Sequence, residues 1–252
     1  NYQIMKLNKK YITENMKTIF YALLIAIIIR SLFFQPFYIP SSSMEPTLLV
    51  GDRLFVTKYS YGYSKHSFPF SPNITEYRFL FKEPKRGDVV VFKTPTDNRT
   101  DYIKRLIGLP GDTIQFIDGD LFINNSQVIK TKIKLPNKTI YCGSEKIQPI
   151  FYEEKLPNGI KYIAVYNKEG SYKNSDKYLV PLNHYFFLGD NRDCSKDSRF
   201  LTSVGYVNKQ NLVGKAKIIF FSSDIKKGRI FKFWKWNKII RFDRFFSMIK
   251  YH

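Results

Sequence analysis

The chain contains 252 residues, of which 41 are lysine or arginine and 21 are aspartate or glutamate, so its formal net charge at pH 7 is +20. The cations are spread along the chain instead of lying on one element, which favours anionic lipid headgroups or acidic partners, although charge alone leaves DNA binding open. Two cysteines are too few for a disulfide scaffold, and no Cys/His cluster has the spacing of a zinc site, so we expect no bound metal.

Residues 18–36 form an apolar segment that is interrupted at Arg30. A spanning helix needs about 20 mostly apolar residues, so the segment is long enough if Arg30 lies near the outer interface and extends its side chain to the headgroups. Lysines at positions 6, 9, 10 and 17 keep residues 1–17 cytoplasmic by the positive-inside rule. A cleaved secretory signal peptide has a similar pattern, but no small-x-small cleavage site follows the apolar run. We therefore predict an uncleaved membrane anchor.

Short runs rich in β-branched and aromatic residues follow the anchor, and turn signals such as residues 109–112 and 118–120 separate them. No rhythm of alternating strands and helices is present. We predict a mostly β fold, in which an N-terminal transmembrane helix precedes an antiparallel β-sheet domain shaped as a barrel or sandwich. The predicted strands are residues 53–56, 88–92, 102–107, 113–117, 161–165, 185–188 and 216–220.

Composition divides the β domain into parts. Residues 37–112 and 183–252 contain the motifs described below, whereas residues 113–182 are more polar and rich in Lys and Asn. We interpret residues 113–182 as an inserted β subdomain whose ends return to the same sheet. Residues 229–250 mix cations with aromatic side chains, which suits the headgroup zone of a membrane, although a final packed strand or helix with a solvated basic face fits equally well.

Ser43 is the candidate nucleophile. It lies in a hydroxyl-rich loop, residues 40–48, that is bracketed by prolines and directly follows the apolar segment. Prolines restrict the loop, and a fixed loop can hold a weak hydroxyl nucleophile in attack geometry. Serines in such loops are mostly turn formers, so the motif needs a partner before it indicates catalysis.

Lys104 is the candidate base. In the predicted strand it shares a face with Tyr102 and Leu106, while Ile103 and Arg105 point the other way. A lysine starts near pKa 10.4, and a fall of two to three pKa units corresponds to roughly 3 to 4 kcal/mol, which burial can supply. The alternative is that Lys104 or Arg105 is an ordinary exposed strand residue.

A third motif, residues 188–199, contains two turns rich in carboxylates and arginines. Such turns can build a rigid polar network beside an active site, where the Ser195 hydroxyl could orient a neutral lysine. The spaced acids superficially suggest a calcium loop, but Arg192 and Arg199 intrude and no helix pattern flanks the segment, so we reject that interpretation.

Together these motifs resemble those of the bacterial type I signal peptidases, the membrane-bound leader peptidase family. The similarity covers the anchor and four blocks in the family's order with compatible spacing. These blocks are residues 40–52, 85–93, 101–112 and 189–199. An ordered set of this kind is specific where each block alone is not.

The resemblance implies a Ser-Lys dyad, in which Ser43 is the nucleophile and Lys104 the general base. It implies an oxyanion hole made by the Ser41 hydroxyl and the Ser43 backbone N–H, and a hydrogen bond from Ser195 to Lys104. The residues expected to support the site from behind are Asp190, Arg192, Asp197 and Arg199.

The resemblance also implies pockets for small substrate residues at positions −1 and −3 before the cut. The residues that would line these pockets are Phe37, Ile39, Pro40, Met44, Leu48, Tyr102 and Ile103. The substrate is expected to lie extended between the segments that precede Ser43 and Lys104, and to add a strand through backbone hydrogen bonds.

The chain departs from the family pattern at several points. Ser42 stands where the family often has Gly, and Cys194 stands where it often has Asn. One span is predicted where many members have two, and the inserted subdomain is shorter than in the larger members. A lysine base argues against the endoplasmic-reticulum branch, while a mitochondrial or plastid relative stays open. The pairing of Cys142 with Cys194 is also open.

The implied function is that of a membrane-bound serine endopeptidase that removes N-terminal signal peptides from exported preproteins, without a metal or cofactor. Its implied partners are signal peptides, membrane phospholipids and the protein export machinery, with no nucleic acid. The implied location is the bacterial cytoplasmic (inner) membrane, crossed once, with the N-terminus in the cytoplasm and the catalytic domain on the outer (periplasmic) side.

Two other classes of protein share part of this pattern. A self-cleaving, repressor-type protease also uses a Ser-Lys dyad, but it would be cytosolic and would carry a DNA-binding head where this chain has its apolar segment. A noncatalytic basic membrane protein that binds nucleic acid or lipid would retain its activity after Ser43→Ala.

Overall fold

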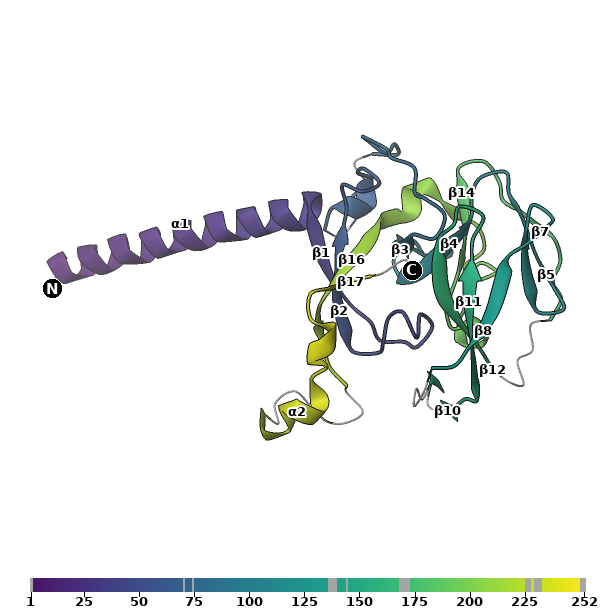
Figure 1. The fold of residues 1–252 in the computed structure, drawn as a ribbon. Coiled ribbons are helices and arrows are strands. Elements are labelled where there is room, and N and C mark those ends of the chain that lie inside the picture. The colour runs from purple at the N-terminus through teal and green to yellow at the C-terminus, as the bar shows by residue number, and fades with distance from the viewer. Residues whose placement is uncertain are drawn as a thin grey trace.

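The computed structural model describes residues 2–69, 71–73, 75–135, 140–143, 145–167, 173–224, 228 and 233–249. Helix α1 (Tyr2–Leu32) projects away from a β body (Figure 1). Its stretch Tyr11–Leu32 has a mean hydropathy of 1.6, and residues 11–30 are exposed. Within the described ranges this is the one helix long and apolar enough to cross a membrane. An apolar surface of this extent needs a nonpolar environment, so α1 fits a membrane anchor.

The structure changes the predicted end of the anchor. Helix α1 ends at Leu32, and strand β1 (Phe34–Tyr38) pairs with β2 (Asp52–Thr57). Residues 34–36 therefore belong to the sheet and not to the helix. The sequence pattern missed β1 because its aromatic residues continue the apolar run of the anchor.

The main sheet has eight antiparallel strands in the order β1-β2-β16-β3-β4-β14-β15, with β17 also paired to β16. The further strands of this sheet are β3 (Val89–Lys93), β4 (Asp101–Gly108), β14 (His184–Leu188), β15 (Val207–Asn208), β16 (Leu212–Ser222) and β17 (Ser247–Met248). The four consecutive apolar residues of β3 are buried on both faces, as expected of a central strand. Val89 and Val91 pack on one side of the sheet, and Val90 and Phe92 on the other.

Strand β16 introduces the curl of the sheet. It pairs with β3 through its first residues and with β2 through the rest, and register shifts interrupt both pairings. Such bulges increase the local twist. At Gly214, close to this change of partner, a Cβ would lie 2.5 Å from the Thr57 carbonyl oxygen, so a side chain there would push the strands apart.

The segment between β4 and β14 forms smaller sheets on the side of the body far from α1 (Figure 1). One sheet has the order β13-β5-β6-β7, a second has the order β12-β11-β8, and β9 pairs with β10. Their bounds are β5 (Thr113–Ile117), β6 (Asp120–Ile123), β7 (Ser126–Gln127), β8 (Ile129–Ile133), β9 (Tyr141–Cys142), β10 (Glu145–Lys146), β11 (Pro149–Lys155), β12 (Lys161–Asn167) and β13 (Tyr178–Leu179). Strands β4 and β14 pair with each other, so this segment leaves and rejoins the main sheet at neighbouring strands. The exact domain boundaries stay a prediction.

The described helices other than α1 are short. They are η1 (Lys65–Ser67), η2 (Arg192–Cys194), η3 (Lys209–Asn211), η5 (Phe233–Lys235), α2 (Trp236–Ile239) and η6 (Phe242–Arg244). In the C-terminal segment, Ile239 and Ile249 are buried while Trp234 and Trp236 are exposed, so it both packs on the body and presents aromatic side chains. Residues 229–232 and 250–252 lie outside the described residues.

The predicted mostly β, antiparallel fold with an N-terminal apolar helix is confirmed. All of the predicted strands coincide with observed ones, namely β2, β3, β4, β5, β12, β14 and β16. These strands were found because each combines a dense run of branched or aromatic residues with a flanking turn signal.

A buried ion pair joins the inserted segment to η2. The Glu154 carboxylate and the Arg192 guanidinium meet through two hydrogen bonds of 2.7 and 2.6 Å, and both side chains are 1 % exposed. The Tyr162 and Tyr166 hydroxyls donate to the same carboxylate. Burial raises the pKa of Glu154, but the guanidinium and these hydrogen bonds outweigh it and hold the pKa below its usual value.

Replacing Glu154 tests the contribution of this pair. Glu154→Gln should lower the free energy of unfolding by about 3 to 5 kcal/mol, because it leaves the Arg192 charge buried without a counter-charge. The matched control is Glu153→Gln, whose carboxylate pairs with Lys161 in a partly exposed position, and which should cost less than about 1 kcal/mol. Urea unfolding of the detergent-solubilised chain measures both, and equal losses would contradict the assignment.

Candidate active site

Ser43 lies in the loop between β1 and β2. Two backbone hydrogen bonds of 2.9 Å, between Ile39 and Asp52 and between Gly51 and Ile39, close the base of this loop. The side chains of Ile39, Met44 and Leu48 are buried in the core beneath it. The loop is therefore held both by its backbone and by apolar packing, as the proline-bracketed sequence predicted.

Lys104 reaches Ser43 from strand β4. Its Nζ atom lies 2.6 Å from the Ser43 Oγ atom, which is hydrogen-bond distance. Lys104 is 3 % exposed and Ser43 is 6 % exposed. The alternative that Lys104 or Arg105 is an exposed strand residue is wrong, because Arg105 is fully buried as well.

Burial dominates the electrostatics of Lys104. Loss of hydration lowers the pKa of the Lys104 ammonium from 10.5 to about 8, against the opposing effect of the Asp197 and Asp190 carboxylates, while Arg199 lowers it further. No described carboxylate forms an ion pair with Lys104. A substantial share of the lysine is therefore neutral near pH 8, as a general base must be.

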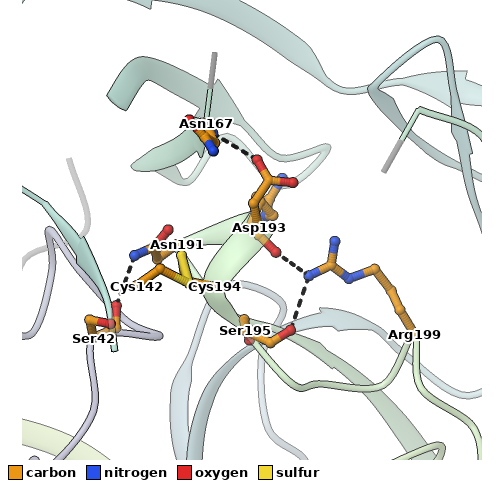
Figure 2. Close-up of a disulfide and its surroundings, with 9 residues drawn as sticks. Ser42, Cys142, Asn167, Asn191, Asp193, Cys194, Ser195 and Arg199 are labelled. Atoms are coloured by element: carbon orange, nitrogen blue, oxygen red, sulfur yellow. Dashed lines mark hydrogen bonds between the residues drawn. A yellow bond between two sulfur atoms is a disulfide. The ribbon is translucent and has the colours of Figure 1, made fainter. Parts of the chain in front are cut away.

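The turn after β14 packs against the Ser43 loop. The Asn191 backbone N–H donates to the Ser43 carbonyl at 3.1 Å, and the Asn191 side chain donates to the Ser42 carbonyl at 3.2 Å (Figure 2). A Cβ on Gly189 would lie 2.2 Å from the Ser195 Oγ and 2.6 Å from the Ser43 carbonyl oxygen. A side chain at position 189 would therefore displace the two loops from each other.

Buried arginine–carboxylate pairs fix this turn. Arg105 binds both oxygens of Asp190 at 2.7 and 2.6 Å, and the Thr47 hydroxyl donates to the same carboxylate. Arg199 binds both oxygens of Asp197 at 2.8 and 3.0 Å. Bidentate pairs of this kind combine strength with a defined orientation.

The supporting residues predicted from the sequence are thus all buried beside the site. Two of them, however, pair with residues outside their own turn. Asp190 pairs with Arg105 of β4, and Arg192 pairs with Glu154 of the inserted segment. Sequence reasoning did not find these roles of Arg105 and Glu154. The position of Arg105 in an apolar strand could have indicated that it is buried and paired, whereas no residue near Glu154 in the sequence indicated its partner.

The predicted orienting residues are close to the dyad, with different contacts from those expected. The Ser41 Oγ lies 3.4 Å from the Ser43 Oγ. The Ser195 Oγ is buried and is near enough to Asp197 to help lower the pKa of that carboxyl, but it forms no well-aligned hydrogen bond within the described residues. The expected hydrogen bond from Ser195 to Lys104 is therefore not formed in this structure.

A cavity of about 420 Å³ opens onto the dyad. It is lined by Ser43 and Lys104 and by five of the predicted substrate-binding residues, Phe37, Ile39, Pro40, Tyr102 and Ile103. Met44 and Leu48, which the resemblance also assigned to substrate binding, do not line it. Both side chains are completely buried in the core under the loop, and this packing holds the loop in position. Lys196 and Cys194 line the cavity and were not predicted to do so.

The walls of the cavity are strand edges. Strand β1 is the last strand of the sheet at one end, and β4 pairs with β14 only from Arg105 onward. Residues 101–104 therefore have no paired strand on that side within the described part of the sheet. Unpaired backbone on both walls can accept an extended peptide as an added strand.

A disulfide joins the β9 hairpin to this site. Cys142 in β9 is bonded to Cys194 in η2, the residue directly before Ser195 (Figure 2). The same short helix is also held by Asp193, which accepts from the Asn167 backbone at 2.7 Å, and by the Arg199 side chain, which donates to the Ser195 carbonyl. The pairing that the sequence left open is thus formed.

Among the residues that the structure describes, no group of three His, Cys, Asp or Glu side chains could hold a metal ion. The polar side chains that line the cavity beside Ser43 include the Ser41 hydroxyl and the buried Lys104 amine. Among the described residues the Ser43 backbone N–H has no hydrogen-bond acceptor.

Comparison with known proteins identifies the family of the chain. Residues 12–221 match the sequence profile of a family described as signal peptidase, peptidase S26. A signal peptidase I from Rickettsia conorii is 43 % identical over 216 residues, which cover 81 % of this chain and 78 % of the relative. A signal peptidase I from Rickettsia typhi is 40 % identical over 225 residues, covering 86 % and 83 %.

A crystal structure of a signal peptidase I from Enterococcus faecalis V583 also matches, with 28 % sequence identity and a TM-score of 0.31, over 53 % of this chain and 97 % of that one. The family profile spans most of the chain, and the curated relatives match over more than two thirds of it. The chain belongs to the signal peptidase family, peptidase S26, and is therefore a peptidase.

Removing the disulfide should destabilise the chain. The bridge closes a loop across a sequence separation of 52, for which the loss of chain entropy in the unfolded state predicts about 4 kcal/mol, and measured effects are commonly about 2 to 4 kcal/mol. Cys142→Ala, Cys194→Ala and the double variant should each show this loss in urea unfolding. Reductant should destabilise the unsubstituted chain and leave the double variant unchanged. A reductant-insensitive unsubstituted chain would contradict the bond.

Proposed function

We propose that this peptidase removes N-terminal signal peptides from exported preproteins by means of a Ser43-Lys104 dyad. The observation that carries the proposal is the 2.6 Å contact between the Lys104 Nζ and the Ser43 Oγ, in a buried site that faces a cavity with strand edges for walls. Membership in the signal peptidase family supports the substrate class.

In the proposed reaction, the neutral Lys104 amine takes the Ser43 proton while the Ser43 oxygen attacks the carbonyl carbon of the scissile bond. The Ser43 N–H and the Ser41 hydroxyl stabilise the oxyanion that forms. The Lys104 ammonium then gives its proton to the leaving amine, and an acyl-enzyme remains. Lys104 next activates a water molecule, which releases the signal peptide and regenerates Ser43.

Two features support a substrate with small residues at positions −1 and −3. The cavity wall includes the apolar side chains of Phe37, Ile39 and Ile103, which suit small apolar substrate side chains better than charged ones. The unpaired edges of β1 and β4 can fix that backbone through hydrogen bonds, so that alternate substrate side chains point to the same wall.

We further propose that the chain crosses the bacterial cytoplasmic membrane once through α1, with its catalytic body outside. The lysines before the apolar segment support a cytoplasmic N-terminus. The Cys142–Cys194 bond supports an oxidising compartment for the body, because disulfides persist outside the cytosol. Phospholipids and the export machinery would then be its partners at the outer face.

Substitution of either dyad residue should abolish cleavage. Ser43→Ala and Lys104→Met should each lower kcat for a preprotein with a small-x-small site by roughly a thousand-fold or more. Loss of one catalytic residue has an effect of this size in other serine proteases. Mass spectrometry of the products gives both the site and the rate. The controls are Ser42→Ala, whose backbone carbonyl contacts Asn191, and Lys155→Met on the exposed end of β11. Turnover by Lys104→Met at the normal rate would exclude the dyad.

The pH dependence tests the state of the lysine. The pKa of Lys104 is lowered to about 8, and the neutral form is the base, so kcat/KM should rise about ten-fold per pH unit below pH 8 and level off above it. Soluble peptide substrates without ionisable side chains suit this measurement. A profile that is flat from pH 6 to 9 would show that Lys104 does not act as the base.

A further inference from the structure

A second cavity, of about 470 Å³, lies beside the end of α1 and carries a strong positive charge. Four cations line it: Arg30 of α1, Lys58 after β2, Lys93 of β3 and Arg99 in the turn before β4. Asp101 is the one carboxylate in its lining. This cationic pocket shares only Asp101 with the cavity at Ser43 and Lys104, so it is a separate site.

Only one of the four cations of this pocket has a carboxylate partner among the described residues. Asp101 already pairs with Lys93 at 2.9 Å. The nearby Asp97 carboxylate is occupied by hydrogen bonds within its own turn. Within the described parts of the chain, Arg30 and Arg99 form no ion pair with a carboxylate.

Lys58 is the most informative of the four cations. It is 2 % exposed, and its Nζ donates to the Ser67 carbonyl, which leaves further N–H donors for another acceptor. Burial, followed by the neighbouring Arg30 charge, lowers the pKa of Lys58 to about 8. Burial also lowers the pKa of His66, in the pocket wall, to about 4, so His66 adds no charge. A buried, unpaired ammonium is costly, and a bound anion would offset that cost.

The pocket is fixed at the level where the apolar helix ends. The Lys58 backbone N–H donates to the Phe33 carbonyl at 3.1 Å, and the Tyr63 hydroxyl donates to the Leu32 carbonyl at 2.9 Å. Phe33 and the adjacent Phe34 are exposed. The end of a spanning helix lies near the boundary between the hydrocarbon core and the headgroups, so the pocket lies at headgroup level.

An apolar groove of about 1230 Å³ adjoins the pocket, and Arg30 lines both. Its walls include Phe34, Phe55 and Ile218. A ligand that reached both cavities would need an anionic group at one end and an apolar chain at the other. A free phosphate ion would occupy only the pocket, whereas a phospholipid could place its phosphate in the pocket and its acyl chains in the groove.

We propose that the cationic pocket binds the phosphate group of an anionic phospholipid, with Arg30 placed between the phosphate and the start of the acyl chains. Arg30 and Arg99 can each offer paired N–H donors to phosphate oxygens, and Lys58 adds a point charge, while Lys93 is already paired with Asp101. The proposal rests on the membrane-anchoring part of the proposed function and not on the dyad.

The full-length chain carrying Ser43→Ala provides the test, because lipid binding is then measured without proteolysis. Native mass spectrometry of this protein in detergent should show that phosphatidylglycerol is retained more strongly than phosphatidylcholine. Arg99→Gln should weaken phosphatidylglycerol retention by about five-fold, the factor that corresponds to about 1 kcal/mol for one cation near an anionic lipid. Lys58→Met should weaken it at least as much.

The matched control is Lys132→Gln, an equal change of charge on an exposed residue of β8, which should leave retention unchanged. Arg99 is exposed, so its replacement keeps the test valid if Lys58→Met fails to fold. Equal retention by Arg99→Gln and the control would overturn the proposal.

Displacement of the lipid by inorganic phosphate at equal concentration would assign the pocket to free phosphate, and stronger displacement by an acidic peptide would assign it to a protein partner. Both results would overturn the lipid assignment, while the dyad would stand or fall separately.

Discussion

The buried Arg105–Asp190 ion pair is the contact on which the site depends. Arg105 follows Lys104 in β4, Asp190 begins the turn after β14, and the Thr47 hydroxyl of the Ser43 loop donates to the same carboxylate. One salt bridge thus joins the three segments that carry the dyad and its surroundings. Because the pair is buried, water does not compete for its charges, and its two hydrogen bonds hold the side chains in one orientation.

The same network sets the chemistry of Lys104. Asp190 and Asp197 are neutralised by their own arginines, so neither forms an ion pair with the lysine, and loss of hydration prevails. A directly paired carboxylate would hold the ammonium charged and remove the base. The arginines therefore serve the lysine by occupying the carboxylates beside it, while Glu154 and the disulfide secure the helix η2 from the inserted segment.

Charge has a different role at the end of α1. At the dyad nearly every buried charge has a partner, whereas the cationic pocket keeps Arg30, Lys58 and Arg99 without a carboxylate among the described residues. Unbalanced charge in a fixed pocket at headgroup level is what an anionic lipid would complete. The surroundings of the dyad thus favour a neutral Lys104 amine, whereas the surroundings of the cationic pocket favour a bound anion.

Strong local signals were enough to predict several elements from the amino-acid sequence. The apolar segment, seven strands bounded by turns, Ser43 in its proline-bracketed loop and Lys104 in an apolar strand were all found, because each depends on residues close together in the chain. Other features became visible only in the folded chain: the end of helix α1 at Leu32, the burial of Met44 and Leu48 beneath the loop, the partners of Asp190 and Arg192, and the bond between Cys142 and Cys194. The paired residues among these lie far apart in the chain, so the local sequence around each one carries no signal of its partner, and only the folded chain brings the partners together.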